Sequence, residues 1–150
     1  DTEMVAARLQ AAGLAPRFVG TEIGRASTIK MLRSVMVKGM EALTVECFRA
    51  AARAGVAEEV ANSLDASEGG LGWAEQTAYN MERMTAHGIR RAAEMREVAK
   101  TLRGLDVAPA MTTGTISWEE EMGALDLSLD SGTPLAEQLT LIERALEKGE

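Results

Sequence analysis

The sequence predicts an all-α bundle around one long central helix, with a short αβ fragment in front of it. Aromatic residues make up only 3% of the 150 residues, so the core has to be built from Ala, Leu, Val and Met. Sheets depend on β-branched and aromatic side chains, whereas Ala, Leu and Met are strong helix formers. No proline occurs between Pro16 and Pro109, so no proline interrupts a helix in that stretch.

The first twenty residues predict the αβ fragment. Residues 2–12 show helical spacing, and Gly13 is suited to the position just after a helix. Residues 16–19 then form a short extended run closed by Gly20, which indicates a strand. A single strand cannot make a sheet, so we expect its partners in another chain or in sequence outside these 150 residues.

Residues 28–54 predict the central helix, with Ser27 or Thr28 as its N-cap and Gly55 as its end. Its length would be roughly 40 Å at 1.5 Å per residue. Apolar side chains occur on several sides of it, which is typical of a helix inside a bundle. We expect Cys47, which has apolar neighbours, to be a buried and unreactive thiol.

Further helices are expected over 56–64 and 74–102, separated by a glycine-rich break at 68–72 and followed by a turn at 104–109. In the second of these helices, five residues are expected to face inward. They are Tyr79, Met84, Ile89, Ala93 and Val98.

The C-terminal part predicts two more helices. The signal over 111–125 is weaker, because the run Thr112 to Thr115 disfavours an early helix start. Glu119, Glu120 and Glu121 are expected to be a solvated charge run. The last helix begins with Thr133 as N-cap and Pro134 in the first turn, and runs to about residue 148.

Composition and charge exclude several classes of function. The net charge of −7 disfavours nucleic acid as the main partner, because phosphate binding needs surplus positive charge. No run of about 20 apolar residues is present to cross a membrane, and the acidic start does not resemble a signal peptide. We therefore expect a soluble, cytoplasmic protein. One Cys and one His exclude an intrachain disulfide and a transition-metal ligand set.

Lys30, Ser34 and Lys38 are the strongest candidates for chemistry. Four residues advance a helix by about 400°, so these three side chains form one slowly drifting stripe on an otherwise apolar helix. Either the stripe is solvated, with lysine stems lying along the apolar surface, or it faces a cleft. In a cleft, a lysine can exchange a proton with a hydroxyl or carbonyl group.

The run GRASTIKMLRSVMVKGMEAL, which begins at Gly24, resembles the interdomain helix of the β-hydroxyacid dehydrogenase superfamily. The likeness is to the phosphogluconate dehydrogenase-like branch with a C-terminal domain of unknown function. The resemblance implies that Lys30 is the catalytic acid/base and that Ser34, where Asn is usual, binds substrate. Val37 stands where 6-phosphogluconate dehydrogenases have a catalytic Glu, so 6-phosphogluconate is not the expected substrate.

A second segment, His87-Gly88-Ile89-Arg90-Arg91-Ala92 followed by Pro109, resembles the family's Lys-Asp-Leu segment and its later proline. The family lysine lies beside the nicotinamide cofactor, so the resemblance implies a cofactor contact at His87. Residues 1–20 are similar to the last helix and strand of the family's Rossmann domain. Residues 21–150 are similar to its all-helical substrate and dimerisation domain.

The resemblance implies an oxidoreductase that uses NAD or NADP, bound mainly by a domain upstream of residue 1. Hydride would pass between the nicotinamide and a small hydroxy acid or its carbonyl form, with Lys38 attracting an acidic group. The chain alone is expected to turn nothing over, and a homodimer is expected. The alternative is a non-enzymatic helical interaction module, in which residues 28–54 form a dimer seam.

Overall fold

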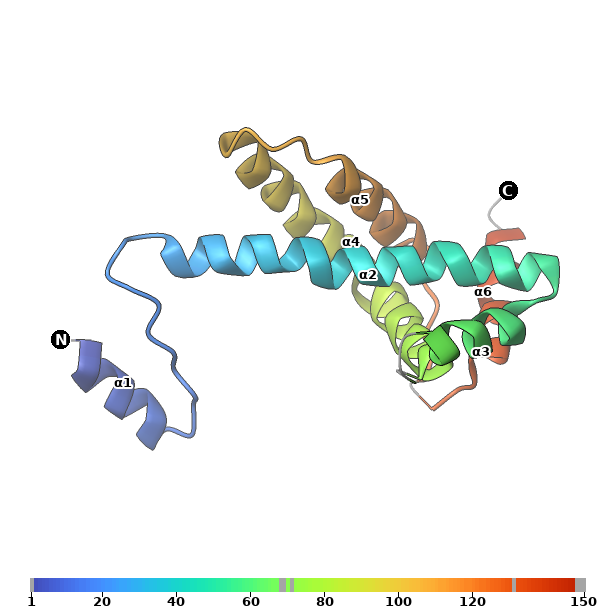
Figure 1. Cartoon of the computed structure of the whole chain (residues 1–150), viewed down its shortest axis with the longest axis horizontal. Helices are drawn as coiled ribbons and strands as arrows, with labels where there is room; N and C mark the ends of the chain where they lie inside the picture. The colour runs from blue at the N-terminus through green and yellow to red at the C-terminus, as the bar shows by residue number, and fades with distance from the viewer. Residues whose placement is uncertain (1, 68–69, 71, 131, 148–150) are drawn as a thin grey trace.

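The computed structural model describes residues 2–67, 70, 72–130 and 132–147, and every regular element in that part of the chain is a helix. Figure 1 shows the arrangement, in which the long helix α2 crosses α4. The helices are α1 (Thr2–Ala11), α2 (Arg25–Ala54), α3 (Ala57–Ser67), α4 (Trp73–Gly104), α5 (Ala110–Gly123) and α6 (Leu135–Glu147). The predicted all-α class is therefore confirmed.

Helix α2 is the central element, and its end was predicted correctly. Gly55 has a φ of 73°, which glycine adopts without penalty. Its N–H bonds to the carbonyl of Ala52, and the N–H of Val56 bonds to that of Ala51, so the last carbonyls of α2 are satisfied. The helix starts at Arg25, three residues before the predicted start.

The core lies where α2, α4, α5 and α6 meet, and methionine fills much of it. Met81, Met84 and Met122 are fully buried in one cluster with Phe48 and Ile142. Methionine has a flexible side chain that adapts to irregular gaps, which compensates for the scarcity of aromatic residues. No helix in the described part of the chain is long and apolar enough to cross a membrane.

Helices α4 and α5 approach each other unusually closely through two glycines. A Cβ atom on Gly88 would lie only 2.8 Å from the Cα atom of Gly123. This contact brings the last turns of α5 against the middle of α4. Glu119 is one turn before Gly123, so the same contact carries the Glu119 side chain into the bundle.

The predicted strand at residues 16–19 is wrong. Residues 14–20 have no regular structure, because the described residues offer no neighbouring strand to complete the hydrogen bonds. Figure 1 shows this segment leading from α1, which stands apart from the bundle. Apolar side chains of α1 and of this segment, including Val5, Leu9 and Phe18, are exposed.

Several expected burials are also corrected. Tyr79, Ile89 and Ala93 are exposed, whereas Met84 and Val98 face inward as predicted. The buried face of α4 instead includes small and polar residues that apolar spacing does not reveal. These are Thr77, Ala78, Asn80, Thr85, Gly88 and Arg91.

Cys47 is exposed and not buried, because it lies on the outer side of α2. Helix α5 begins at Ala110 and runs through the Thr-rich segment, contrary to prediction. The hydroxyl groups of Thr113 and Thr115 donate to the carbonyls of Pro109 and Met111, so these threonines bond within the helix.

The last predicted helix is confirmed. Both Glu137 and Gln138 donate their backbone N–H to the carbonyl of Pro134, which marks the first turn of α6. Residue 148, the predicted end, lies outside the described residues, as do residues 68, 69 and 71 of the predicted glycine-rich break.

Candidate functional site

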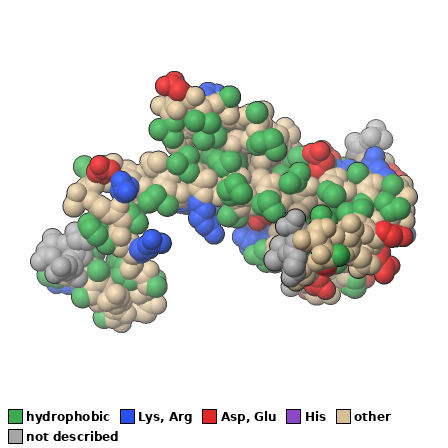
Figure 2. Space-filling model, viewed as in Figure 1, with side chains coloured by type: hydrophobic (Ala, Val, Ile, Leu, Met, Phe, Trp, Pro, Cys, Tyr) green, Lys and Arg blue, Asp and Glu red, His purple; other side chains and the backbone are tan. Residues whose placement is uncertain are grey.

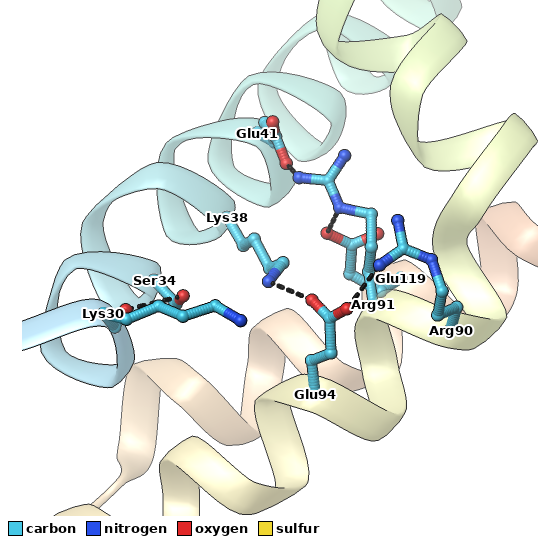
Figure 3. Close-up of polar contacts among 8 residues, drawn as sticks. All are labelled: Lys30, Ser34, Lys38, Glu41, Arg90, Arg91, Glu94 and Glu119. Atoms are coloured by element: carbon cyan, nitrogen blue, oxygen red, sulfur yellow. Dashed lines mark hydrogen bonds and ion pairs between the residues drawn. The ribbon is translucent and has the colours of Figure 1, made fainter. Parts of the chain in front are cut away.

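A cleft of about 360 Å³ lies between α2 and α4, and the three predicted α2 residues line it together. Figure 3 shows Lys30, Ser34 and Lys38 on successive turns of α2, with α4 on the other side. Residues three and four apart share one face of a helix, which is why the spacing brings them together. The full lining is Lys30, Arg33, Ser34, Val37, Lys38, Glu41, Tyr79, Arg83, Arg90, Arg91 and Glu94.

Lys30 lies at the outer end of the cleft. Its side chain is exposed, and within the described ranges no carboxylate lies within ion-pair distance of its ammonium group. Ser34 donates its hydroxyl to the Lys30 backbone carbonyl at 3.0 Å, which leaves the oxygen lone pairs of Ser34 free to accept a hydrogen bond. The pair is therefore open to a small molecule entering the cleft.

Lys38 lies deeper, with only 8% of its surface exposed. Its Nζ donates to Glu94 Oε2 at 2.9 Å, and Arg90 pairs with the other oxygen of the same carboxylate. The hydrogen bond from Lys38 is the largest cause that lowers the pKa of Glu94. Glu94 therefore stays ionised and fixes both cations in the wall of the cleft.

Behind this wall, Arg91 lies between two carboxylates. Its guanidinium group pairs with Glu41 of α2, and its Nε atom lies 3.2 Å from Oε1 of Glu119 of α5. Figure 3 shows the three side chains meeting where the helices cross. Arg91 thus joins the three helices that carry the cleft and the core beneath it.

Glu119 corrects the prediction of a solvated glutamate run. It is 0% exposed, because the close approach of α4 and α5 turns it inward, whereas Glu120 and Glu121 are partly exposed and pair with Arg96 and Arg49. Burial raises the pKa of Glu119 to about 7, although nearby Arg91 opposes this effect. The helix therefore holds a carboxyl group that titrates near neutral pH.

Positive charge is concentrated in the cleft. Six lysines and arginines line it, against two glutamates, although the whole chain has a net charge of −7. Both glutamates are engaged, Glu41 with Arg91 and Glu94 with Lys38 and Arg90. A cleft lined by one sign of charge attracts ligands of the other sign, so this one favours anions.

The structure does not bring His87 into the cleft. His87 is half-buried on α4 and lines a separate shallow hollow with Gly88 and with Gly123 of α5. Arg90 borders both the hollow and the cleft.

Sequence reasoning missed most of the α4 wall. Arg90 and Arg91 belong to the segment that resembles the family, yet no role was predicted for them. Glu94 follows at helical spacing from both arginines, which is the pattern of a paired charge on one face. That spacing was the available signal. No comparable signal shows that Glu41 or Glu119 is buried.

Comparison with known proteins places this arrangement in context. Residues 51–122 match the family described as "Domain of unknown function (DUF1932)", the C-terminal domain of 3-hydroxyacid dehydrogenase-like proteins. A conserved hypothetical protein from Sinorhizobium meliloti 1021 has a similar structure, with a TM-score of 0.82 and 34% identity, covering 95% of this chain and 48% of that one.

A second solved structure is of a conserved protein of unknown function, and it is described as similar to 3-hydroxyacid dehydrogenases. It has a TM-score of 0.69 and 34% identity, covering 81% of this chain and 46% of that chain. An uncharacterised 28.5 kDa protein of Methanothermus fervidus is 29% identical over 103 residues, which is 69% of this chain and 41% of the relative.

This chain thus spans less than half the length of each of these relatives. In sequence and fold it is similar to the C-terminal helical domain of 3-hydroxyacid dehydrogenase-like proteins. The resemblance drawn from the lysine motif is therefore confirmed.

Proposed function

We propose that residues 21–150 are the C-terminal substrate-binding and dimerisation domain of an NAD(P)-dependent oxidoreductase. The reaction is hydride transfer between the nicotinamide and a small hydroxy acid or its carbonyl form. Residues 1–20 are the tail end of the nucleotide-binding domain. Their exposed apolar side chains and their position apart from the bundle support this division.

One observation carries the proposal. Lys30, Ser34 and Lys38 line a single cleft in which cations outnumber carboxylates. Such a cleft suits a small anionic molecule, and it offers a lysine at its open end to the group that reacts. The similarity to 3-hydroxyacid dehydrogenase-like proteins supports the same chemistry for this cleft.

Each residue has a distinct role in this proposal. Lys30 accepts the hydroxyl proton of the substrate during oxidation and returns that proton during reduction. Ser34 hydrogen-bonds the substrate through its hydroxyl group. Lys38, held by Glu94, attracts the acid group of the substrate.

The residues present fit the substrate side of a nicotinamide-dependent site. The cleft supplies a proton carrier and a site for an acid, and the open side at Lys30 leaves room for a second domain. The cofactor, NAD or NADP, supplies the hydride chemistry when bound. The chain has no glycine-rich nucleotide fingerprint, so the cofactor is held mainly by residues outside it. His87 is the proposed contact within this domain.

The proposed homodimer forms along an apolar stripe on the outer side of α2. The stripe consists of Ile29, Leu32, Met36 and Leu43, all exposed at spacings of three, four and seven residues. Figure 2 shows hydrophobic side chains gathered along this helix. The same stripe favours the alternative, a non-enzymatic dimerisation module that uses the helix without the cleft.

A substrate screen separates the two functions. The full-length protein is mixed with NAD or NADP and a panel of short-chain 3-hydroxy acids, and nicotinamide absorbance is followed. Absorbance change with at least one hydroxy acid supports the oxidoreductase. If the protein is a stable dimer and nicotinamide absorbance changes with none of the hydroxy acids, in either direction of the reaction, the result supports the interaction module.

A further inference from the structure

A second pocket, of about 370 Å³, lies beside the cationic cleft and differs from it in chemistry. Its apolar wall is formed by Val37 and Met40 of α2 and by Trp73 and Tyr79 of α4. Two aromatic rings in one pocket stand out in a chain with only 3% aromatic residues. The volume is within the usual range for sites that bind small molecules.

The two cavities adjoin each other. Val37, Glu41 and Tyr79 line both of them, so a molecule in the cleft lies next to the pocket. Around α2, the cleft residue Lys30 and the pocket residue Met40 lie on neighbouring faces. A ligand therefore meets cations on one side of the shared wall and apolar side chains on the other.

Three polar side chains that line the pocket, those of Gln76, Asn80 and Thr44, are engaged in one chain of hydrogen bonds. Gln76 donates its amide N–H to Asn80 Oδ1, and Asn80 donates to the hydroxyl of Thr44 at 2.9 Å. The Thr44 hydroxyl in turn donates to the backbone carbonyl of Glu41 at 2.8 Å. Because this chain of bonds holds the polar side chains together, the pocket offers its apolar wall to a ligand.

We infer that the substrate is a hydroxy acid with an apolar substituent, whose acid end occupies the cationic cleft and whose substituent enters the Val37–Met40–Trp73–Tyr79 pocket. This inference rests on the proposed function and narrows its substrate class. A bare three-carbon hydroxy acid would leave the pocket empty. A substituent the size of a phenyl ring removes its own apolar surface from water there, which favours binding.

Binding of non-reactive probes tests the inference separately from turnover. The dissociation constants of 3-phenylpropionate, propionate and 3-phenylpropan-1-ol are measured by calorimetry on the full-length protein. We expect 3-phenylpropionate to bind at least tenfold more tightly than either of the others, because it alone has both a carboxylate for the cationic cleft and a phenyl group for the pocket. Affinities of 3-phenylpropionate and propionate within twofold of each other would overturn the inference.

Two matched variants test whether the phenyl group of 3-phenylpropionate binds in the pocket. Met40→Trp fills the pocket and should remove the preference for 3-phenylpropionate while leaving propionate binding within twofold. Met36→Trp makes the same change one turn earlier, on the apolar stripe but outside both cavities, and should keep the preference. Equal effects of the two variants, or a change in molar mass with Met40→Trp alone, would assign the pocket to a subunit contact and overturn the inference.

Turnover measurements test the apolar subsite and the proposed oxidoreductase activity separately. Hydroxy acids with and without a phenyl group at C3 are compared by nicotinamide absorbance. Turnover of both with equal kcat/KM contradicts the apolar subsite and leaves the oxidoreductase standing. Tight binding of 3-phenylpropionate without turnover of any hydroxy acid contradicts the oxidoreductase, whereas the pocket remains supported.

Discussion

Arg91 of α4 and Glu119 of α5 lie against each other inside the bundle, with 3.2 Å between Arg91 Nε and Glu119 Oε1. Neither atom has a hydrogen-bond partner, so the two groups are in contact without hydrogen-bond geometry. The pair is also close to Lys38, Arg83 and Glu94, whose charges act on Glu119. Burial nevertheless dominates, and Glu119 keeps its proton up to a pH of about 7.

The titration of Glu119 predicts a pH-dependent stability. Its pKa is about 7 in the folded chain, against an ordinary value of 4.5, so the folded state binds this proton more tightly. The resulting stability is fully present below pH 4.5 and is lost as the pH rises to about 7. The loss is on the order of 3 kcal/mol at most, at about 1.4 kcal/mol for each pKa unit.

Glu119→Gln should remove this part of the pH dependence, because the amide stays neutral. Urea unfolding at several pH values between 4.5 and 8 measures the free energy of unfolding for both proteins. The difference between the two free energies cancels the contributions of the other titrating groups. A constant difference across the whole range would show that the carboxyl group does not change its protonation on unfolding.

Gly88→Ala should strongly destabilise the protein. The new Cβ would lie 2.8 Å from Gly123 Cα, so α4 and α5 would have to move apart. The expected loss is about 3 kcal/mol or more of unfolding free energy. Gly114→Ala on α5 is the control, because its Cβ meets nothing within 4 Å and alanine favours the helix by about 1 kcal/mol. Equal stability of the two variants would contradict the close helix contact.

Lys30→Met should lower turnover of the responsive hydroxy acid by about 10²- to 10⁴-fold, the usual contribution of a positioned acid/base. Because Lys30 is exposed, the thermal unfolding temperature should stay close to that of the unmodified protein. Lys100→Met serves as the control, since Lys100 pairs on the surface with Glu97 and lines no part of the cleft. Turnover that is unchanged in Lys30→Met would remove the proton-transfer role from this residue.

Leu43→Lys should weaken the proposed dimer. A charge at Leu43, the last residue of the apolar stripe, would have to be desolvated in the interface, whereas the monomer leaves it in water. Light scattering over a concentration series should show dissociation at higher protein concentration than for the unmodified protein. Met111→Lys introduces the same charge at an exposed methionine on α5, outside the stripe. A molar mass that is the same for all three proteins would place the interface elsewhere.

Much of the helical arrangement was predictable, because helix ends and apolar spacing are local properties. Gly55 fixes the end of α2, and the spacing of Lys30, Ser34 and Lys38 fixes their common face. The strand at residues 16–19 failed because strand formation depends on a partner that local sequence does not supply. The start of α5 failed because its threonines bond within the helix, where their usual preference is for turns.

The deeper half of the site could not be predicted. Glu119 appears in a run of three glutamates, and its burial depends on a contact between Gly88 and Gly123 that are far apart in the sequence. Tyr79 looked like a core residue by its type, yet it lines both cavities from an exposed position. In each case tertiary packing determines whether the side chain is buried or exposed, and the spacing of residues in one sequence does not reveal that packing.

Helix α2 presents three different surfaces as one moves around its axis, namely the apolar stripe, the aromatic-walled pocket and the cationic cleft. Neighbouring residues of α2 therefore belong to surfaces with different proposed roles. Substitutions taken one residue at a time along α2 should give phenotypes that recur about every 3.6 residues and sort into assembly, substrate choice and catalysis. With such a division, a substitution at Met40 could change the substrate preference while the proposed roles of Lys30 in catalysis and of Leu43 in assembly are kept.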